Sequence, residues 1–344
     1  MSYVNYITET FKKLTSIDGP SGFTSNASDF CVEEFKRLGY DAMKTVKGGV
    51  IVSLGGKDKE NGILLSAHLD TLGGMVKAIK GNGRLRISPV GGLTANNVEA
   101  ENCKVYTRDG KVFTGCLQLD NASTHVNKDY NTTARTFDTL EVVLDTLSTS
   151  KEETIKDGIS VGDFVCVDPK TVITETGFVK SRFIDDKMSV AVILGLAKYL
   201  KEENITPERA IYAHMTVYEE VGHGACGTMP DGVTEMLAID MGCVGDGLTC
   251  TEREVSICAK DSRGPYNYEM TSKLIELAKK HELRYAVDIY PMYGSDCDAA
   301  LGAGYDIRHA LIGTGVYASH GYERTHIDGI EATFELAKAF ILEK

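Results

Sequence analysis

The chain has 344 residues, of which 42% are hydrophobic and 25% charged, and its formal net charge is −12 at neutral pH. This composition excludes a disordered chain, a collagen-like chain and a coiled coil, and no apolar run is long enough for a membrane span, so we expect no membrane partner. An acidic protein repels phosphate backbones, so nucleic acid is excluded as a partner too, and the length predicts two domains.

The start of the chain alternates between helical and strand patterns. Residues 4–14 and 30–38 carry apolar side chains near helical spacing, and Gly39 follows the second segment as a stop signal. Residues 49–54 and 62–67 are apolar runs typical of strands, and the second reads as fully buried. This order is typical of an α/β domain.

The pattern changes between residues 73 and 165. Short β-like pieces lie between Gly and Asn turns, and Asp109-Gly110 separates two of them as a hairpin signal. The only helix candidate in this stretch is a short one at 139–147. The sequence therefore predicts a small β-rich module inserted into the α/β chain.

Alternation resumes near position 166. The pattern predicts helices at 188–201, 268–281 and 329–342, and strands at 210–218 and 236–239. Strands that alternate with helices favour a mostly parallel sheet with helices on both faces.

Acidic or histidine side chains follow most of the predicted strands and one further apolar run. They are His68 and Asp70, Asp185 and Asp186, Glu219 and Glu220, Asp240, and the late loop residue His320. Open α/β sheets bind ligands at the carboxyl ends of their strands, so these groups are expected to converge. Two imidazoles with several carboxylates suit a pair of divalent ions such as zinc, cobalt or manganese, bridged by one Asp of the 185–186 pair.

Each of these motifs also has a purely structural interpretation. His68 with Asp70 is equally typical of a buried histidine held by an acid, although Asp70 could also fix the tautomer of a metal-binding His68. Asp185-Asp186 could cap a helix, and an isolated Glu219-Glu220 pair is more often solvated. In a metal site, one of the two glutamates would face the metal and the other the attacking water, as a general base.

The ordered set of motifs is far more specific than any one of them. Residues 67–71, 183–187, 217–222, 238–241 and 319–323 together resemble the TET-type (tetrahedral) aminopeptidases, a metallopeptidase family that includes glutamyl aminopeptidases and proteins labelled endoglucanase. The resemblance implies an α/β/α three-layer sandwich as the catalytic domain, formed by 1–72 and 166–344. It also implies that 73–165 is a small inserted β-barrel that mediates dimerisation.

The resemblance further implies a role for each candidate residue. His68 and Asp240 would hold opposite metals of a zinc, cobalt or manganese pair, and Asp185 would bridge the two metals. The peptide bond between Asp185 and Asp186 is often cis in such sites. Glu220 and His320 would complete the ligand set, Glu219 would be the general base and Asp70 would support His68. His326 is the rival for the last ligand, and spacing to the following helix favours His320. Residues 293–296 resemble a substrate-pocket loop, with Ser295 and Asp296 as substrate-binding residues.

The implied activity is removal of N-terminal residues from short peptides, with metal-activated water as the nucleophile, in a homo-oligomer that is a dodecamer built from dimers. Alternatives are another amide hydrolase such as a deacylase, a glycosidase, or a scaffold without activity. Adjacent Glu219 and Glu220 diverge and the chain has no Trp, which disfavours a sugar-cleaving site. Nine cysteines without a C-x-x-C pair indicate free thiols in a reducing cytoplasm.

Overall fold

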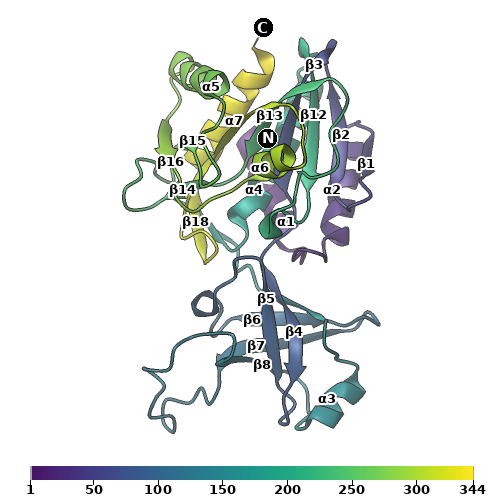
Figure 1. Cartoon of the computed structure of the whole chain (residues 1–344), viewed down its shortest axis with the longest axis vertical. Helices are drawn as coiled ribbons and strands as arrows, with labels where there is room; N and C mark the ends of the chain where they lie inside the picture. The colour runs from purple at the N-terminus through teal and green to yellow at the C-terminus, as the bar shows by residue number, and fades with distance from the viewer. Residues whose placement is uncertain (1, 344) are drawn as a thin grey trace. The chain divides into compact units, whose positions relative to one another are not determined.

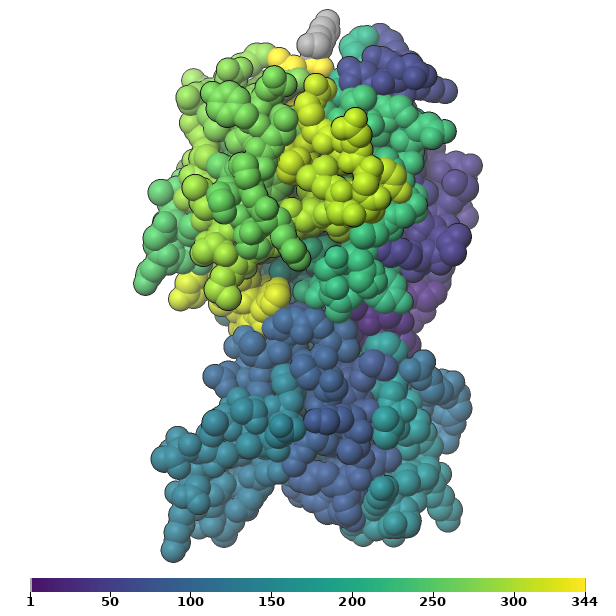
Figure 2. All heavy atoms as spheres, viewed as in Figure 1, coloured from purple at the N-terminus to yellow at the C-terminus, as the bar shows by residue number. Residues whose placement is uncertain are grey.

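A computed structural model describes residues 2–343 of the chain. The chain divides into two compact units, one formed by 1–70 with 170–344 and the other by 71–169. In the space-filling view the purple start of the chain and its green and yellow end gather in one body, and the blue segment forms the second (Figure 2).

The larger unit contains one twelve-stranded sheet whose main path runs β1-β2-β12-β3-β13-β17-β18-β11-β10. Its strands are β1 (Ala42–Lys44), β2 (Val50–Gly55), β3 (Asp58–His68), β10 (Val172–Ile173), β11 (Phe178–Ser181), β12 (Arg209–Thr216), β13 (Val233–Ile239), β14 (Gly242–Val244), β15 (Val255–Lys260), β16 (Tyr285–Ile289), β17 (Arg308–Tyr317) and β18 (Glu323–His326).

The sheet is mixed, so the prediction of a mostly parallel sheet is right only for its centre. Strands β12, β3, β13 and β17 run parallel to one another. On one side of this centre β2 joins β12 antiparallel, and on the other β15 and β18 join β17 antiparallel. At the β1 edge the pairing is also antiparallel, because β1 and β2 are joined by a short turn that allows no other arrangement.

Helices cover the two faces unequally. They are α1 (Tyr3–Thr15), α2 (Ser25–Arg37), α4 (Ile184–Glu202), α5 (Tyr268–Lys280), α6 (Asp296–Gly302) and α7 (Ile327–Leu342). Alternate residues of each strand point to opposite faces, so Leu65 joins the core under α1, α2, α4, α5 and α7, whereas Leu64 joins a smaller core under α6. Helix α6 is drawn in front of the central strands in Figure 1. The three-layer arrangement predicted from the resemblance is therefore present, with one short helix in the thinner layer.

Sequence spacing explains how the first helix reaches its partner. Helix α1 buries Ile7, Phe11 and Leu14, which lie one turn apart on one face, and Ser2 caps its start by accepting a hydrogen bond from Asn5 N (3.3 Å). Helix α4 meets this face at Gly195, where a Cβ atom would lie 2.7 Å from Ile7 Cγ1. The glycine thus permits the close approach of the two helices.

The smaller unit is a closed barrel with the strand order β4-β5-β8-β7-β6-β9, which confirms the predicted inserted β-barrel. Its strands are β4 (Gly73–Ile79), β5 (Leu85–Val90), β6 (Asn102–Tyr106), β7 (Val112–Leu119), β8 (Leu140–Leu144) and β9 (Phe164–Val167), with the short helical segments η1 (Ala95–Asn97) and α3 (Lys151–Asp157). The predicted turn at Asp109-Gly110 is present between β6 and β7.

The helix candidate at 139–147 is wrong, because this stretch contains strand β8. Leu140 and Val142 are fully buried in the barrel, and β8 pairs with β5 and β7, so pairing partners far away in sequence decide its conformation. The helix of this region, α3, begins later at a capping box formed by Ser150 and Glu153. That spacing was the signal that the sequence reading missed.

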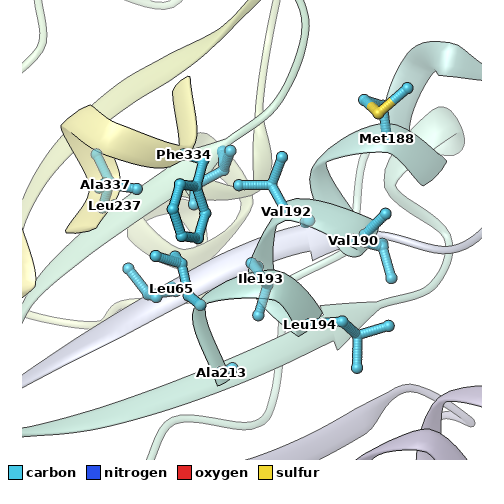
Figure 3. Packing of buried hydrophobic residues seen from close by; sticks show 14 of the residues in the cluster. Leu65, Met188, Val190, Val192, Ile193, Leu194, Ala213, Leu237, Phe334 and Ala337 are labelled. Atoms are coloured by element: carbon cyan, nitrogen blue, oxygen red, sulfur yellow. The ribbon is translucent and has the colours of Figure 1, made fainter. Parts of the chain in front are cut away.

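Leu65 lies at the centre of the main core, where it faces Ile193 of α4 and Phe334 of α7 (Figure 3). We expect Leu65→Ala to lower the free energy of unfolding by about 2–5 kcal/mol, because a fully buried leucine leaves a cavity that the packed core fills only partly. Val46→Ala is the control, since the Val46 side chain is fully exposed. Urea unfolding measures both, and equal midpoints for the two variants would contradict the expectation.

Candidate metal centre

The carboxyl ends of the central strands bring the candidate residues together. His68 is the last residue of β3, Asp240 follows β13, and Glu219 and Glu220 lie in the short helix η2 (Glu219–Val221) that follows β12. Because β12, β3 and β13 are parallel neighbours, these three ends meet at one edge of the sheet. Asp185 reaches the same edge from the start of α4.

Two groups of potential metal ligands form there and share one residue. His68, Asp185 and Asp240 make the first group, and Asp185, Glu220 and His320 make the second, with the ligand atoms of each group within 4.8 Å of one another. All five predicted ligands therefore converge, and Asp185 is the member that the two groups share. The peptide bond between Asp185 and Asp186 is cis, also as expected.

The distances define the arrangement around Asp185. Its Oδ1 lies 3.0 Å from His68 Nε2, and its Oδ2 lies 3.6 Å from His320 Nε2. His320 Nε2 is also 3.7 Å from Glu220 Oε2. The two oxygens of one carboxylate thus face two different imidazoles, which is the geometry expected of a group that bridges two ions.

One expectation about the ligand set is contradicted by this geometry. The resemblance implied that His68 and Asp240 hold opposite metals, but they belong to the same group. The reason is that β3 and β13 are adjacent parallel strands, so their ends present the two side chains next to each other. The opposite group takes its carboxylate and its imidazole from the loops after β12 and β17.

Burial and mutual repulsion shape the electrostatics of the cluster. Burial raises the pKa of Glu219 and of Glu220, and neighbouring aspartates add to the effect. Burial together with the charge of Asp185 raises the pKa of Asp240 to about 7. Burial also acts to raise the pKa of Asp185, but the hydrogen bond and charge of His68 outweigh it and lower that pKa. Buried carboxylates that repel one another, with two imidazoles among them, fit divalent cations.

Asp70 supports the cluster through both its main-chain carbonyl and its carboxylate. Its main-chain carbonyl lies 2.9 Å from His68 Nδ1, so the backbone makes the close contact with the imidazole. Its carboxylate accepts hydrogen bonds from the amides of Glu219 (3.1 Å) and Glu220 (3.3 Å), and from Ser21 Oγ (2.5 Å). Asp70 therefore connects the end of β3 with the segment that carries the two glutamates.

His320 and His326 occupy different environments. His326 is the N-cap of α7, where its Nδ1 accepts from Asp328 N (3.0 Å) and its Nε2 lies 2.9 Å from the carbonyl of Thr176. Both of its ring nitrogens therefore have partners away from the ligand groups. His320 lies in the loop between β17 and β18 and belongs to the second group.

The two candidate substrate-binding residues are buried at the start of α6. Ser295 caps this helix and lies 2.9 Å from the hydroxyl of Tyr266. Asp296 accepts a hydrogen bond from Thr216 Oγ1 (2.7 Å), and burial raises its pKa to about 6. A Cβ atom on Gly224 would lie 2.0 Å from Asp296 Oδ1, so this carboxylate packs under the segment after Glu220. A role in substrate binding stays a prediction.

The sequence reading missed two supporting residues. Glu323 is buried and accepts from the amides of Asp185 and His320, each at 3.1 Å, so it holds the backbone of two ligands at once. Ser21, which donates to Asp70, is the other. Glu323 lies inside the motif at 319–323 and was the available signal, whereas nothing around Ser21 pointed to the site.

Comparisons with known proteins agree on one family. The sequence profile of the M42 glutamyl aminopeptidases matches residues 48–336. The putative aminopeptidase YhfE of Bacillus subtilis is 41% identical over 341 residues, which cover 99% of each chain. Aminopeptidase APDkam598 from the archaeon Desulfurococcus kamchatkensis has a solved structure with a TM-score of 0.88 and 26% identity, covering 100% of this chain and 96% of that one.

A further solved structure, the TET1 peptidase of Pyrococcus horikoshii, has the same fold, with a TM-score of 0.83 at 22% identity over 98% of this chain and 100% of that one. The family profile covers most of the chain, and the Bacillus relative matches it from end to end. The chain therefore belongs to the M42 glutamyl aminopeptidase family of metal-dependent peptidases.

Proposed function

We propose that this protein is an aminopeptidase with two divalent metal ions that removes N-terminal residues from short peptides. The observation that carries the proposal is the pair of ligand groups sharing Asp185, with the Glu219 carboxylate beside them at 3.7 Å from His68 Nε2. Two ions held in this way polarise a carbonyl group and lower the pKa of water. Zinc and cobalt suit the nitrogen and oxygen donors, and manganese is the third candidate.

The two ligand groups suggest which side chains would bind each of the two ions. His68 and Asp240 would hold one ion, Glu220 and His320 the other, and Asp185 both. Asp70 and Glu323 bind backbone amides of these residues and so keep the ligands in place before any ion binds. A ligand set fixed in advance lowers the cost of organising the site when the ions and the substrate bind.

Glu219 is the acidic residue beside the two ligand groups that we propose as the general base. It belongs to neither ligand group, yet its Oε2 lies among them, and its backbone is fixed by the Asp70 carboxylate. In the proposed reaction Glu219 accepts a proton from the attacking water and passes it to the departing amine. A carboxylate in this position contributes about 10²–10⁴-fold to the rate.

We also propose that the protein works as an oligomer in a reducing compartment. The Pyrococcus horikoshii TET1 peptidase can assemble into a tetrahedron or a large octahedral shell. For this chain we propose a dodecamer built from dimers, with the barrel unit mediating dimerisation. All nine cysteines carry free thiols, which favours the cytoplasm. None of the helices in residues 2–343 is long and apolar enough to cross a bilayer.

A panel of aminoacyl anilides and their N-acetylated forms tests the reaction. We expect the free anilides to be cleaved and the acetylated forms to resist, because an aminopeptidase requires the free amino group. A strong chelator should abolish cleavage, and zinc or cobalt should restore it. Release of acetate from the acetylated forms, with the anilide bond left intact, would indicate a deacylase. Cleavage that survives chelation would contradict the metal mechanism.

A further inference from the structure

We propose that Lys47 is a positioning residue that holds the segment 218–226, which carries Glu219 and Glu220, in its working conformation. Lys47 lies outside every motif discussed above, on the turn between β1 and β2. The inference rests on the proposed function for its effect on turnover, whereas the contact itself is a property of the fold.

The Lys47 ammonium binds three backbone carbonyls of this segment. Its Nζ donates to the carbonyls of His223, Gly224 (2.7 Å) and Cys226 (3.3 Å). A lysine ammonium has three N–H groups and no acceptor, so these three bonds use its full capacity. No N–H group remains for a substrate carboxylate, which favours a positioning role over a binding role.

The turn that presents Lys47 is itself firmly held. Thr45 N donates to Gly49 O (2.8 Å), Gly48 N donates to Thr45 O (2.9 Å), and Ser28 Oγ of α2 donates to Gly48 O (2.6 Å). Gly49 packs directly on β12, since a Cβ atom there would lie 2.7 Å from Met215 O. Lys47 therefore starts from a backbone that is anchored to the same strand that leads to Glu219.

The segment needs such support because its backbone is strained at Tyr218. Tyr218 has φ 71°, and a tyrosine in the left-handed region persists only when its surroundings fix it. Asp70 binds the amides of Glu219 and Glu220 at the beginning of the segment, and Lys47 binds carbonyls near its end. The Asp70 carboxylate thus holds the beginning of the segment, and the Lys47 ammonium holds its end.

Loss of the ammonium should loosen the far end of the segment and let Glu219 leave the site. Gly224 lies close to Glu219, since a Cβ atom on Gly224 would be 3.0 Å from Glu219 Cβ. Movement of the Gly224 backbone should therefore displace the Glu219 side chain. Small displacements of a catalytic group are costly, because the reaction depends on near-attack geometry.

Lys47→Met tests the proposal, because methionine keeps most of the aliphatic stem and removes the charge. The matched control is Lys44→Met on strand β1, whose ammonium pairs with Asp29 (2.5 Å) and binds no residue of the segment. Two quantities are measured for each variant: amide hydrogen exchange in peptides covering 218–226, and kcat and KM on aminoacyl anilides.

We expect Lys47→Met to speed exchange in 218–226 at least tenfold, with β12 unchanged, and to lower kcat at least tenfold while KM stays within twofold. Lys44→Met should match the wild type, and Lys47→Arg should recover part of kcat. Exchange and kcat equal to those of Lys44→Met, or exchange raised throughout the larger unit, would overturn the proposal.

If Lys47→Met does not fold, Lys47→Gln replaces it, because the polar but shorter and uncharged glutamine side chain cannot make all three bonds, and the same changes in exchange and kcat are expected. The exchange measurement is independent of the reaction. A wild-type protein that cleaves no anilide would therefore refute the proposed function and still leave the role of Lys47 to be decided by exchange.

Discussion

Glu219→Gln is expected to lower kcat by about 10²–10⁴-fold and to leave the bound metal at the wild-type level. Glutamine has the shape of glutamate but cannot accept a proton at neutral pH. Glu219 belongs to neither ligand group, so its replacement removes no metal ligand. The backbone N–H of residue 219 would still donate to the Asp70 carboxylate, so the segment should keep its position. Steady-state rates and metal analysis of the same preparation measure the two effects.

The neighbouring residue provides the contrast. Glu220→Gln alters a member of the second ligand group, so it should lower metal content as well as activity. Glu60→Gln, at an exposed position, controls for the change of charge and should behave as wild type. Wild-type turnover in Glu219→Gln would eliminate this residue as the general base. Loss of metal in that variant would instead make Glu219 a ligand.

Asp185→Ala is expected to abolish binding of both metal ions, and with it all cleavage of anilides. Asp185 is the one residue common to the two ligand groups, and its two oxygens face His68 and His320. Asp240→Ala and His320→Ala each weaken one group only. We therefore expect about two ions per chain in the wild type, one in each single-group variant and none in Asp185→Ala, by metal analysis after dialysis.

The number of metal ions bound by each variant distinguishes a site for one ion from a site for two. Asp231→Ala replaces an exposed aspartate away from the groups and should keep the wild-type metal content. Asp185→Asn repeats the test with the shape of the side chain preserved, in case the alanine variant folds poorly. One ion in the wild type, or one ion retained by Asp185→Ala, would be incompatible with a shared bridging carboxylate.

The elements that could be predicted from the sequence are those whose pattern is local. The apolar spacing of 188–201, 268–281 and 329–342 predicted α4, α5 and α7, because an amphipathic or buried helix repeats its pattern every turn. The stretch at 139–147 misled this reasoning because its apolar residues suit a helix as well as a strand. The pairing with β5 and β7 is what makes this stretch a strand, β8.

The candidate site was predictable to the extent that parallel strands fix it. Acids and histidines that follow such strands must meet at one edge, which places His68, Glu219, Glu220 and Asp240 together before any coordinates are known. The grouping within the site was not predictable in this way. His68 belongs to the same ligand group as Asp240 because β13 lies next to β3, and the sequence of neither segment specifies this strand order.

By itself, then, the sequence pattern determined the α/β character, the inserted β-rich module and the side chains available for metal binding, whereas the barrel form of the module was implied by the family resemblance. The tertiary structure alone decided which of them share a group, and which residues hold the backbone around them. Ser21 with Asp70, Lys47 with Gly224 and Glu323 with Asp185 join positions 49, 177 and 138 residues apart. The physical reason is that a single hydrogen bond imposes no periodicity on the chain, so only the folded structure reveals these pairs.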